Sequence, residues 1–182
     1  STLDEIAREK AAIAIKGKPI LSSPQDPEAE KAIRQITNQT QAPLTFVKSP
    51  LLGYSLSLSG EHQKQNAALA CEAIVAAGLH LSFDVVQHAL QHIQWPGRFE
   101  KINETLILDA AHNPHAAEAL VKTWQTEFPT KKASIIFGSV EDKSTDAVLS
   151  KLSEIAKEFH FVPVNSQRGL APESHAVKGK SV

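Results

Sequence analysis

Residues 106–137 read LILDAAHNPHAAEALVKTWQTEFPTKKASIIF, and this stretch decides the expected fold. A short apolar run at 106–109 precedes a helical pattern at 114–128, and a second apolar run follows at 133–137. Asn113 and Pro114 are typical of the N-cap and the first position of a helix. Strands that alternate with helices of about 10–15 residues indicate βαβ units. The stretch therefore predicts an α/β fold with a parallel sheet.

The same alternation continues on both sides of this stretch. Downstream, the pattern predicts a helix at 145–157 and a strand at 159–164. Upstream, the expected helices are 3–13, 24–37, 60–77 and 82–93, and the expected strands are 19–22, 44–48 and 54–58. Asp26 and Pro27 are expected to be the N-cap and the first-turn proline of the second helix. Between the two regions, Gln94-Trp95-Pro96-Gly97-Arg98 contains helix-breaking residues and is interpreted as a linker. The sequence thus predicts two domains, residues 1–94 and 95–182.

Composition excludes several classes of protein. The chain has 182 residues and a formal net charge of −1, which argues against a protein that mainly coats nucleic acid or anionic membrane. A single cysteine, Cys71, excludes an internal disulfide and a cysteine-rich zinc site, and it fits a reducing compartment. No apolar run approaches the roughly 20 residues of a membrane span. Methionine is absent, so Ser1 is not a translation start and the sequence is expected to be part of a longer protein.

Lys10 has an unusual place in the first helical pattern. The spacing puts it on one face with Leu3, Ile6, Ala7 and Ile13. An ammonium group on a buried apolar face is costly unless it is paired, and burial favours the neutral amine that lysine chemistry uses. The alternative is a lysine whose stem packs while its charged head reaches water. Both interpretations stay open from the residues alone.

Asp109 and His112 stand between a predicted strand and the helix capped by Asn113. Ligands of α/β folds bind at the carboxyl edge of a parallel sheet, where a carboxylate suits a ribose hydroxyl and a helix N-terminus suits an anion. The spacing Asp109-x-x-His112-x-x-His115 also fits a metal site, although spacing does not ensure convergence. Capping alone explains Asn113 and Pro114, so only Asp109 and the histidines carry functional weight.

Weaker candidates lie elsewhere in the chain. His62 and Asn66 are four residues apart on one helix face, where they could contact a nucleotide or face solvent. The guanidinium of Arg98 suits a polyphosphate, or an interdomain salt bridge. Gly179-Lys180-Ser181 is similar to the end of a phosphate-binding loop, but the leading glycine is replaced by Ser174 and only Val182 follows. We therefore do not interpret it as such a loop.

Five segments, in chain order, together resemble one enzyme family. They are LDEIAREKAAIAIKGKPIL at 3–21, GEHQKQNAALA at 60–70, WPGRFE at 95–100, LDAAHNPHA at 108–116 and FGSVEDKSTDAVL at 137–149. Their counterparts are the EKAGI helix, the HQ..NA helix, the interdomain linker, the LDGAHNPHA element and the FG...DKD segment of the folylpolyglutamate synthase and dihydrofolate synthase family of Mur ligases. Ala11-Ala12 and Ala110-Ala111 depart from the family's Ala-Gly and Gly-Ala.

The resemblance implies an ATP-dependent ligase of folate biosynthesis and one-carbon metabolism. Such an enzyme phosphorylates a carboxylate of dihydropteroate or of folate's glutamate tail, and the amine of L-glutamate then attacks the acyl phosphate. The implied cofactors are ATP and Mg²⁺, and the implied state is a cytoplasmic monomer without nucleic-acid or membrane partners. Residues 1–94 would be the C-terminal half of the central ATPase domain. Residues 95–182 would be the Rossmann-like C-terminal domain, short of its usual closing strand.

The resemblance also implies roles for individual residues. Lys10 matches a lysine that is carbamylated to hold magnesium, and it is expected to be catalytic together with His112. Asn66 matches a position near the base of ATP, Arg98 one near the phosphates, and Asp109 one associated with the ribose.

The resemblance also implies that some elements of the family are missing from this chain, and two alternative functions stay open. The family's glycine-rich loop, early folate-binding region and further magnesium ligands would lie before Ser1, so the chain alone is expected to be inactive. A cell-wall Mur ligase is one alternative, and a catalytically silent nucleotide-binding or interaction remnant is the other.

Overall fold

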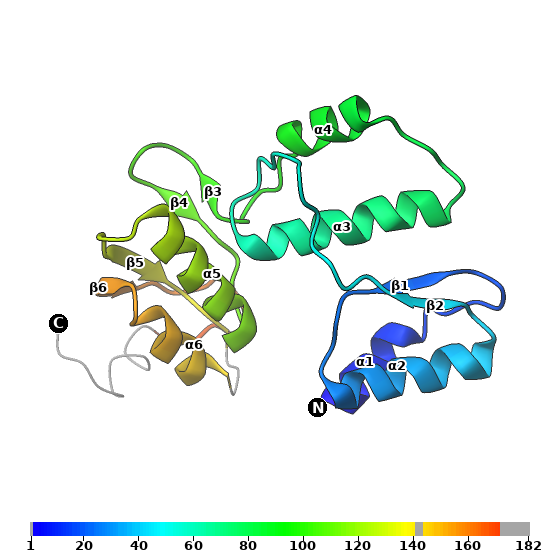
Figure 1. The fold of residues 1–182 in the computed structure, drawn as a ribbon. Helices are drawn as coiled ribbons and strands as arrows, with labels where there is room; N and C mark the ends of the chain where they lie inside the picture. The colour runs from blue at the N-terminus through cyan, green and yellow to red at the C-terminus, as the bar shows by residue number, and fades with distance from the viewer. Residues whose placement is uncertain (1, 141–143, 172–182) are drawn as a thin grey trace. The chain divides into compact units, whose positions relative to one another are not determined.

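The computed structural model describes residues 2–140 and 144–171, which belong to two compact units. The N-terminal unit comprises Ser1–Ser57 and Glu61–Ile93, and the C-terminal unit comprises Leu58–Gly60 and Gln94–Val182. Each unit contains helices and a pair of parallel strands (Figure 1). The α/β fold with parallel sheets that the sequence predicts is therefore confirmed.

The N-terminal unit contains a parallel strand pair with a helix between the two strands. Its elements are α1 (Leu3–Ala11), β1 (Ile20–Ser22), α2 (Pro27–Thr40), β2 (Leu44–Phe46), α3 (Glu61–Ala76) and α4 (Phe83–His92). Strands β1 and β2 pair in parallel with Ile20 opposite Leu44, and α2 forms the crossover that a parallel pair requires.

Local sequence explains where these helices begin and how they pack. Thr2 and Glu5 form a capping box at the start of α1. Pro27 occupies the first turn of α2 after Asp26, as the sequence predicts. Helices α1 and α2 pack through small side chains, because the buried cluster between them consists of Ala7, Ala29 and Ala32.

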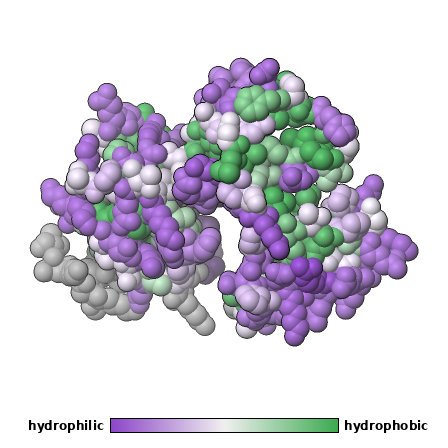
Figure 2. Space-filling view, in the orientation of Figure 1, coloured by the Kyte–Doolittle hydropathy of each residue, from purple (hydrophilic) through white to green (hydrophobic). Residues whose placement is uncertain are grey.

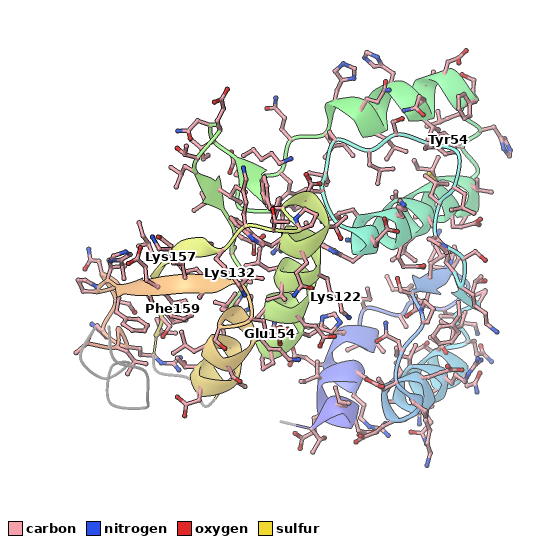
Figure 3. The ribbon with its side chains drawn as sticks, turned by 60° about the vertical axis from the view of Figure 1, so that its left-hand side comes forward. Tyr54, Lys122, Lys132, Glu154, Lys157 and Phe159 are labelled. Carbon is pink, nitrogen blue, oxygen red and sulfur yellow. The ribbon has the colours of Figure 1, made fainter. Side chains whose placement is uncertain are left out.

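The C-terminal unit contains an antiparallel hairpin and a β-α-β crossover. Its elements are β3 (Glu100–Lys101), β4 (Ile107–Leu108), α5 (Pro114–Glu127), β5 (Ala133–Phe137), α6 (Thr145–Leu152) and β6 (Ala156–Phe161). Strands β5 and β6 are parallel and joined through α6. Lys132, just before β5, donates through Nζ to the carbonyl oxygen of Glu154 at 2.5 Å (Figure 3). Because Glu154 lies just before β6, this hydrogen bond joins the starts of the two parallel strands.

The core of the C-terminal unit lies between α5, α6 and strands β5 and β6. Its buried cluster is Ala117, Val121, Val148, Leu152 and Ile155, and half-buried Leu120, Trp124, Ile135, Phe137 and Phe159 pack against it. The indole Nε1 of Trp124 donates to the carbonyl oxygen of Lys131 at 2.8 Å, so the polar edge of this large side chain is satisfied.

The predicted strand at 54–58 is wrong, because this segment has no regular secondary structure. Its polar groups bond to α4 instead of to a neighbouring strand. The side-chain amide of Gln87 accepts from the Ser55 amide at 3.1 Å and donates to the Ser55 carbonyl at 3.0 Å. The Ser57 amide donates to the carbonyl of Leu90 at 3.0 Å. A side chain that offers both a donor and an acceptor therefore replaces the ladder that the alternating pattern predicted.

Two further sequence predictions in the C-terminal unit need correction. The run 106–109 does not join the parallel sheet, because β4 pairs antiparallel with β3. Asn103 makes this hairpin by accepting through Oδ1 from the amides of Thr105 and Leu106, both at 2.9 Å. The helix predicted at 145–157 ends at Leu152, and β6 begins at Ala156. Among the described residues, none of the helices combines the length and apolar character of a membrane span.

The two units differ in how much large apolar surface they bury, which leads to a first prediction. Several large side chains around α3 and α4 are exposed and gather on the surface of the N-terminal unit, among them Val75, Leu79, Phe83 and Val85 (Figure 2). Burial of apolar area is the main source of stability, and local opening is easiest where it is small. The buried cluster between α1 and α2 consists of alanines alone, whereas the buried cluster of the C-terminal unit contains larger aliphatic side chains. Backbone amides of α5 and β5 are therefore expected to exchange with deuterium more slowly than those of α1 and α2. Native-state exchange followed by mass spectrometry measures this, and equal or reversed protection would show that the described cores do not set the stability of the units.

Candidate functional site

Asp109 is the organising residue of the candidate site in the C-terminal unit. It follows β4 directly and is half-buried. Its Oδ2 accepts from the Phe99 amide at 2.8 Å, and its Oδ1 accepts from the Ala111 amide at 2.8 Å. One carboxylate thereby joins the loop before β3 to the loop before α5.

The loop before β3 is fixed by contacts of Gly97 and of Phe99, on either side of Arg98. The Gly97 amide donates to Oε2 of Glu100 at 2.8 Å, and the Gly97 carbonyl accepts from the Ala110 amide at 2.9 Å. Gly97 has φ of 71°, a left-handed conformation that glycine adopts without strain. Phe99, with φ of 45°, is buried, and its ring centroid lies 6.5 Å from that of Trp124. Arg98, between these two anchored residues, is exposed, so its guanidinium is available to a ligand.

His112 and the start of α5 complete this cluster. Nδ1 of His112 lies 3.0 Å from the carbonyl oxygen of Ala110. A carbonyl oxygen can only accept, so Nδ1 donates this hydrogen bond, and in the neutral form of the exposed ring Nε2 is the acceptor. Asn113 caps α5 by accepting from the Ala116 amide at 2.9 Å, as the sequence predicts. The structure thus brings the Arg98 loop, Asp109 and His112 to one helix N-terminus, which is suited to an anionic ligand.

Lys10 does not lie on a buried face of α1. Helix α1 buries Ala7 and Ala11, because its contact with α2 runs along its alanine side. The Lys10 side chain is 74% exposed, and its Nζ lies 2.8 Å from Oε1 of Glu9. This hydrogen bond and the ammonium charge lower the pKa of the Glu9 carboxyl. Lys10 therefore resembles the solvent-facing lysine of the alternative interpretation.

Asn66 belongs to a hydrogen-bonded row at the start of α3. Its Nδ2 donates to Oε1 of Gln63 at 3.0 Å, and Nε2 of Gln63 donates to Nε2 of His62 at 3.0 Å. Gln63 is buried and holds its two exposed neighbours in place. Sequence reasoning missed Gln63, although its place between the two selected residues was a usable signal. Lys10 and Asn66 belong to the N-terminal unit, and Arg98, Asp109 and His112 belong to the C-terminal unit.

The structure also tests the metal interpretation and shows the environment of the single cysteine. Within the described ranges, no group of three or more His, Cys, Asp or Glu side chains is arranged to hold a metal ion, so the metal site suggested for Asp109, His112 and His115 is wrong. Partial burial and the nearby Glu72 charge raise the pKa of the Cys71 thiol, which argues against an activated nucleophile. Gly179-Lys180-Ser181 lies outside the described residues.

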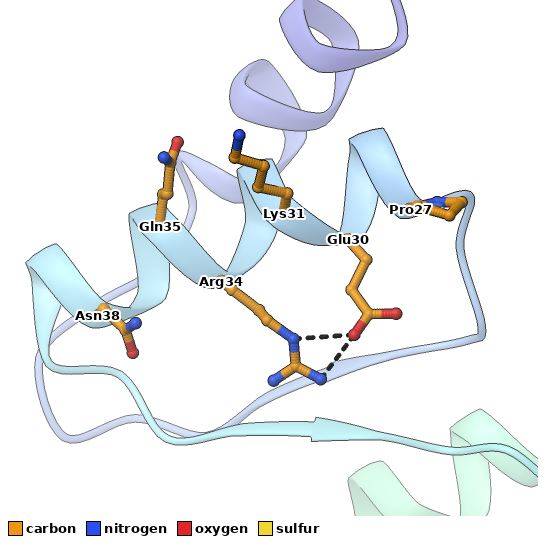
Figure 4. Close-up of a pocket in the computed structure, with 6 residues that line it drawn as sticks. All are labelled: Pro27, Glu30, Lys31, Arg34, Gln35 and Asn38. Atoms are coloured by element: carbon orange, nitrogen blue, oxygen red, sulfur yellow. Dashed lines mark hydrogen bonds and ion pairs between the residues drawn. The ribbon is translucent and has the colours of Figure 1, made fainter.

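A groove in the N-terminal unit runs along one face of α2. It is lined by Pro27, Glu30, Lys31, Arg34, Gln35 and Asn38 (Figure 4). Inside it, Arg34 pairs with Glu30 at 2.6 Å, and the guanidinium lies 4.8 Å from the centroid of the Phe46 ring. None of the five predicted site residues lines this groove. Because Glu30 and Arg34 already pair with each other, we do not assign the groove to the candidate site.

Comparison with known proteins identifies the family. Residues 97–180, which contain Arg98, Asp109 and His112, match the Mur ligase, glutamate ligase domain. The chain is 29% identical over 197 residues to the dihydrofolate synthase/folylpolyglutamate synthase of Bacillus subtilis, a match that covers 92% of this chain and 46% of that protein. The chain belongs to the folylpolyglutamate synthase and dihydrofolate synthase family. It spans about half the length of the curated relatives that it matches.

Solved structures of this family have the same fold. The Mycobacterium tuberculosis folylpolyglutamate synthase, complexed with ADP and AMPPCP, has a TM-score of 0.86 and 26% identity, over 97% of this chain and 47% of that one. A bifunctional folylpolyglutamate synthase/dihydrofolate synthase with Mn, AMPPNP and L-glutamate bound has a TM-score of 0.81 and 28% identity, over 95% of this chain and 46% of that one. These relatives bind nucleotides, and one also binds a divalent metal and L-glutamate.

Proposed function

We propose that this chain is part of an ATP-dependent ligase that joins L-glutamate to dihydropteroate or to the glutamate tail of a folate. The observation that carries the proposal is the match of residues 97–180 to the glutamate ligase domain, over the same residues that gather Arg98, Asp109 and His112 at a helix N-terminus. The nucleotide, metal and glutamate complexes of similar structures support the substrate classes. The proposed setting is a cytoplasmic monomer, and the single cysteine supports the reducing compartment.

The proposed domain assignment follows the two units. Residues 1–94 would be the C-terminal half of a central ATPase domain, and residues 95–182 would be the C-terminal Rossmann-like domain. The change of unit between Ile93 and Gln94, and the start of the family match at residue 97, support this boundary.

In the proposed reaction, a substrate carboxylate attacks the γ-phosphorus of ATP and ADP leaves, which gives an acyl phosphate. The amine of L-glutamate then attacks the acyl carbon, inorganic phosphate leaves, and the amine proton is lost to solvent or to a base. The chain's own contribution is positioning and charge neutralisation. Arg98 would hold phosphate oxygens, Asp109 would order the loop that carries Arg98 and orient the ribose, and Asn66 would contact the base. Nε2 of His112 would accept a proton.

Magnesium would need ligands in addition to those that the described residues supply. Mg²⁺ takes oxygen ligands in near-octahedral geometry. The ammonium of Lys10 cannot ligate a cation, and only its carbamate would supply an oxygen. Because no group of three ligands occurs in the described ranges, these residues do not form a magnesium site by themselves. We therefore propose Lys10 as a contributor of one carbamate oxygen and assign no step to the metal.

A chimera tests the function directly. The part of the Bacillus subtilis relative that this chain matches is replaced by this chain, and circular dichroism checks that the chimera folds. We expect ADP release that depends on both L-glutamate and the pteroate or folate substrate. A folded chimera that binds ATP but releases no ADP in response to L-glutamate would contradict the proposed function and favour a silent nucleotide-binding module.

The isolated chain provides a second prediction. Because it spans 46% of its relative and its described residues form no metal-binding group, we expect no L-glutamate-dependent ADP release from the 182 residues alone. A coupled ADP assay over several hours, with the chimera as the positive control, measures this. Turnover by the isolated chain would show that it contains a complete catalytic site.

A further inference from the structure

Two histidines on α4 face each other outside the candidate site. His88 and His92 are one helical turn apart, so they share a face of α4, and both are exposed. Their ring centroids lie 4.2 Å apart with an interplanar angle of 32°. The pair lies within the N-terminal unit, and its geometry depends on one helix only. Two imidazoles held this close on a regular helix can reach the same ligand.

The hydrogen bonding of His92 fixes which nitrogen is free. Nδ1 of His92 lies 2.6 Å from the carbonyl oxygen of His88. That oxygen can only accept, so Nδ1 carries the proton, and the lone pair of the neutral ring lies on Nε2. Metal-ligating histidines commonly donate one ring N–H to a backbone carbonyl and bind the metal with the other nitrogen. His92 thus already has the tautomer and the supporting contact of a ligand.

The composition of this face indicates the class of metal. Neutral imidazole suits Zn²⁺, Cu²⁺ and Ni²⁺, whereas Mg²⁺ prefers oxygen. Asp84 lies one turn before His88 on the same face, but the described residues contain no converging group of three such ligands. Two imidazoles therefore define the site, and water fills the remaining coordination positions.

We propose that His88 and His92 together bind one transition-metal dication of the zinc, copper and nickel class. The proposal is independent of the proposed ligase activity. A cation shared by the two rings links the ends of the last turn of α4, which would otherwise fray because its final carbonyls have no helical partner. Metal that binds the folded helix in preference to the unfolded chain also stabilises that turn.

Isothermal titration of the full chain with ZnCl₂, NiCl₂, CuCl₂ and MgCl₂ tests this site. We expect one site that binds Cu²⁺ most tightly, in the order of intrinsic affinities, and no heat from Mg²⁺ that depends on these residues. His88→Gln and His92→Gln should each weaken zinc and nickel binding at least about tenfold, because a two-ligand site does not survive the loss of one ligand. The matched control is His80→Gln, an exposed histidine just before α4, which should bind as the unmodified chain does.

Two further measurements distinguish metal binding at His88 and His92 from unfolding and from binding elsewhere. Far-UV circular dichroism confirms that each variant keeps its helices. In a 15N-labelled sample, substoichiometric Cu²⁺ should broaden the amide signals of residues 84–92 before other signals. Zinc and nickel affinities that stay unchanged in both His88→Gln and His92→Gln would overturn the proposal. Absence of any binding to the unmodified chain, or an equal loss in His80→Gln, would overturn it as well.

Discussion

Replacing Asp109 with alanine is expected to cause the largest loss of stability of any single substitution in the candidate site. The carboxylate accepts two backbone N–H groups, from Phe99 and Ala111, both at 2.8 Å. Hydrogen bonds to charged groups contribute about 1.5–3 kcal/mol each, and partial exposure reduces that value. We expect a loss of about 2–4 kcal/mol, which for a unit of this size lowers the unfolding midpoint by roughly 10 °C or more.

Two further variants make this result specific. Asp109→Asn keeps one side-chain acceptor and should lose about half as much stability as Asp109→Ala. Glu104→Ala removes an exposed carboxylate from the β3–β4 hairpin and should change the free energy of unfolding by no more than about 0.5 kcal/mol. Differential scanning calorimetry of the three variants measures the order. If Asp109→Ala unfolds like Glu104→Ala, the carboxylate does not hold the two loops together.

Replacing Arg98 is expected to have the opposite signature, a large effect on nucleotide binding with little effect on stability. Arg98 is exposed, while its neighbours Gly97 and Phe99 carry the contacts that fix the loop. A guanidinium binds phosphate oxygens with two parallel, charge-assisted hydrogen bonds, and lysine cannot reproduce that geometry. In the chimera, Arg98→Ala should raise the KM for ATP roughly 10- to 100-fold, and Arg98→Lys should recover only part of the loss.

A matched arginine provides the control for this effect. Arg34 lies in the α2 groove and pairs with Glu30, and none of the predicted site residues lines that groove. Arg34→Ala should leave the KM for ATP unchanged. The free energy of unfolding of Arg98→Ala should stay within about 0.5 kcal/mol of that of the unmodified chain. An unchanged KM in Arg98→Ala, or a KM that rises equally in Arg34→Ala, would contradict the phosphate-binding role.

Local sequence predicted the helices well because their signals are local. The Asn113 cap and the Pro27 helix start are both present at the predicted positions. The strand at 133–137 matches β5. The strand at 54–58 failed because an alternating pattern does not show what bonds to the backbone, and here the Gln87 side chain does so. The antiparallel pairing of β4 likewise depends on the Asn103 turn, which the strand-helix alternation did not reveal.

The residues of the candidate site were selected from the sequence, but their contacts could not be read from it. The motif around Asp109 pointed to loops that the structure brings together, yet no sequence pattern indicated that its two oxygens accept from the amides of Phe99 and Ala111. Helical periodicity misplaced Lys10, because the face of α1 that packs on α2 is set by small alanines rather than by its larger apolar side chains. Gln63 was missed because its place between His62 and Asn66 indicates proximity only, whereas its burial and its two hydrogen bonds appear only in the structure.

The central claim is that the loops around Arg98 and Asp109 form part of a nucleotide site. Titration of the 15N-labelled chain with ADP, followed by two-dimensional NMR, tests it most directly, because chemical shifts detect binding even in the millimolar range. The account predicts that the amide signals of Arg98, Phe99, Ala111 and His112 move with ADP concentration and that Arg98→Ala abolishes the movement. Signals that do not move at these positions, or that move only along the α2 groove, would contradict it.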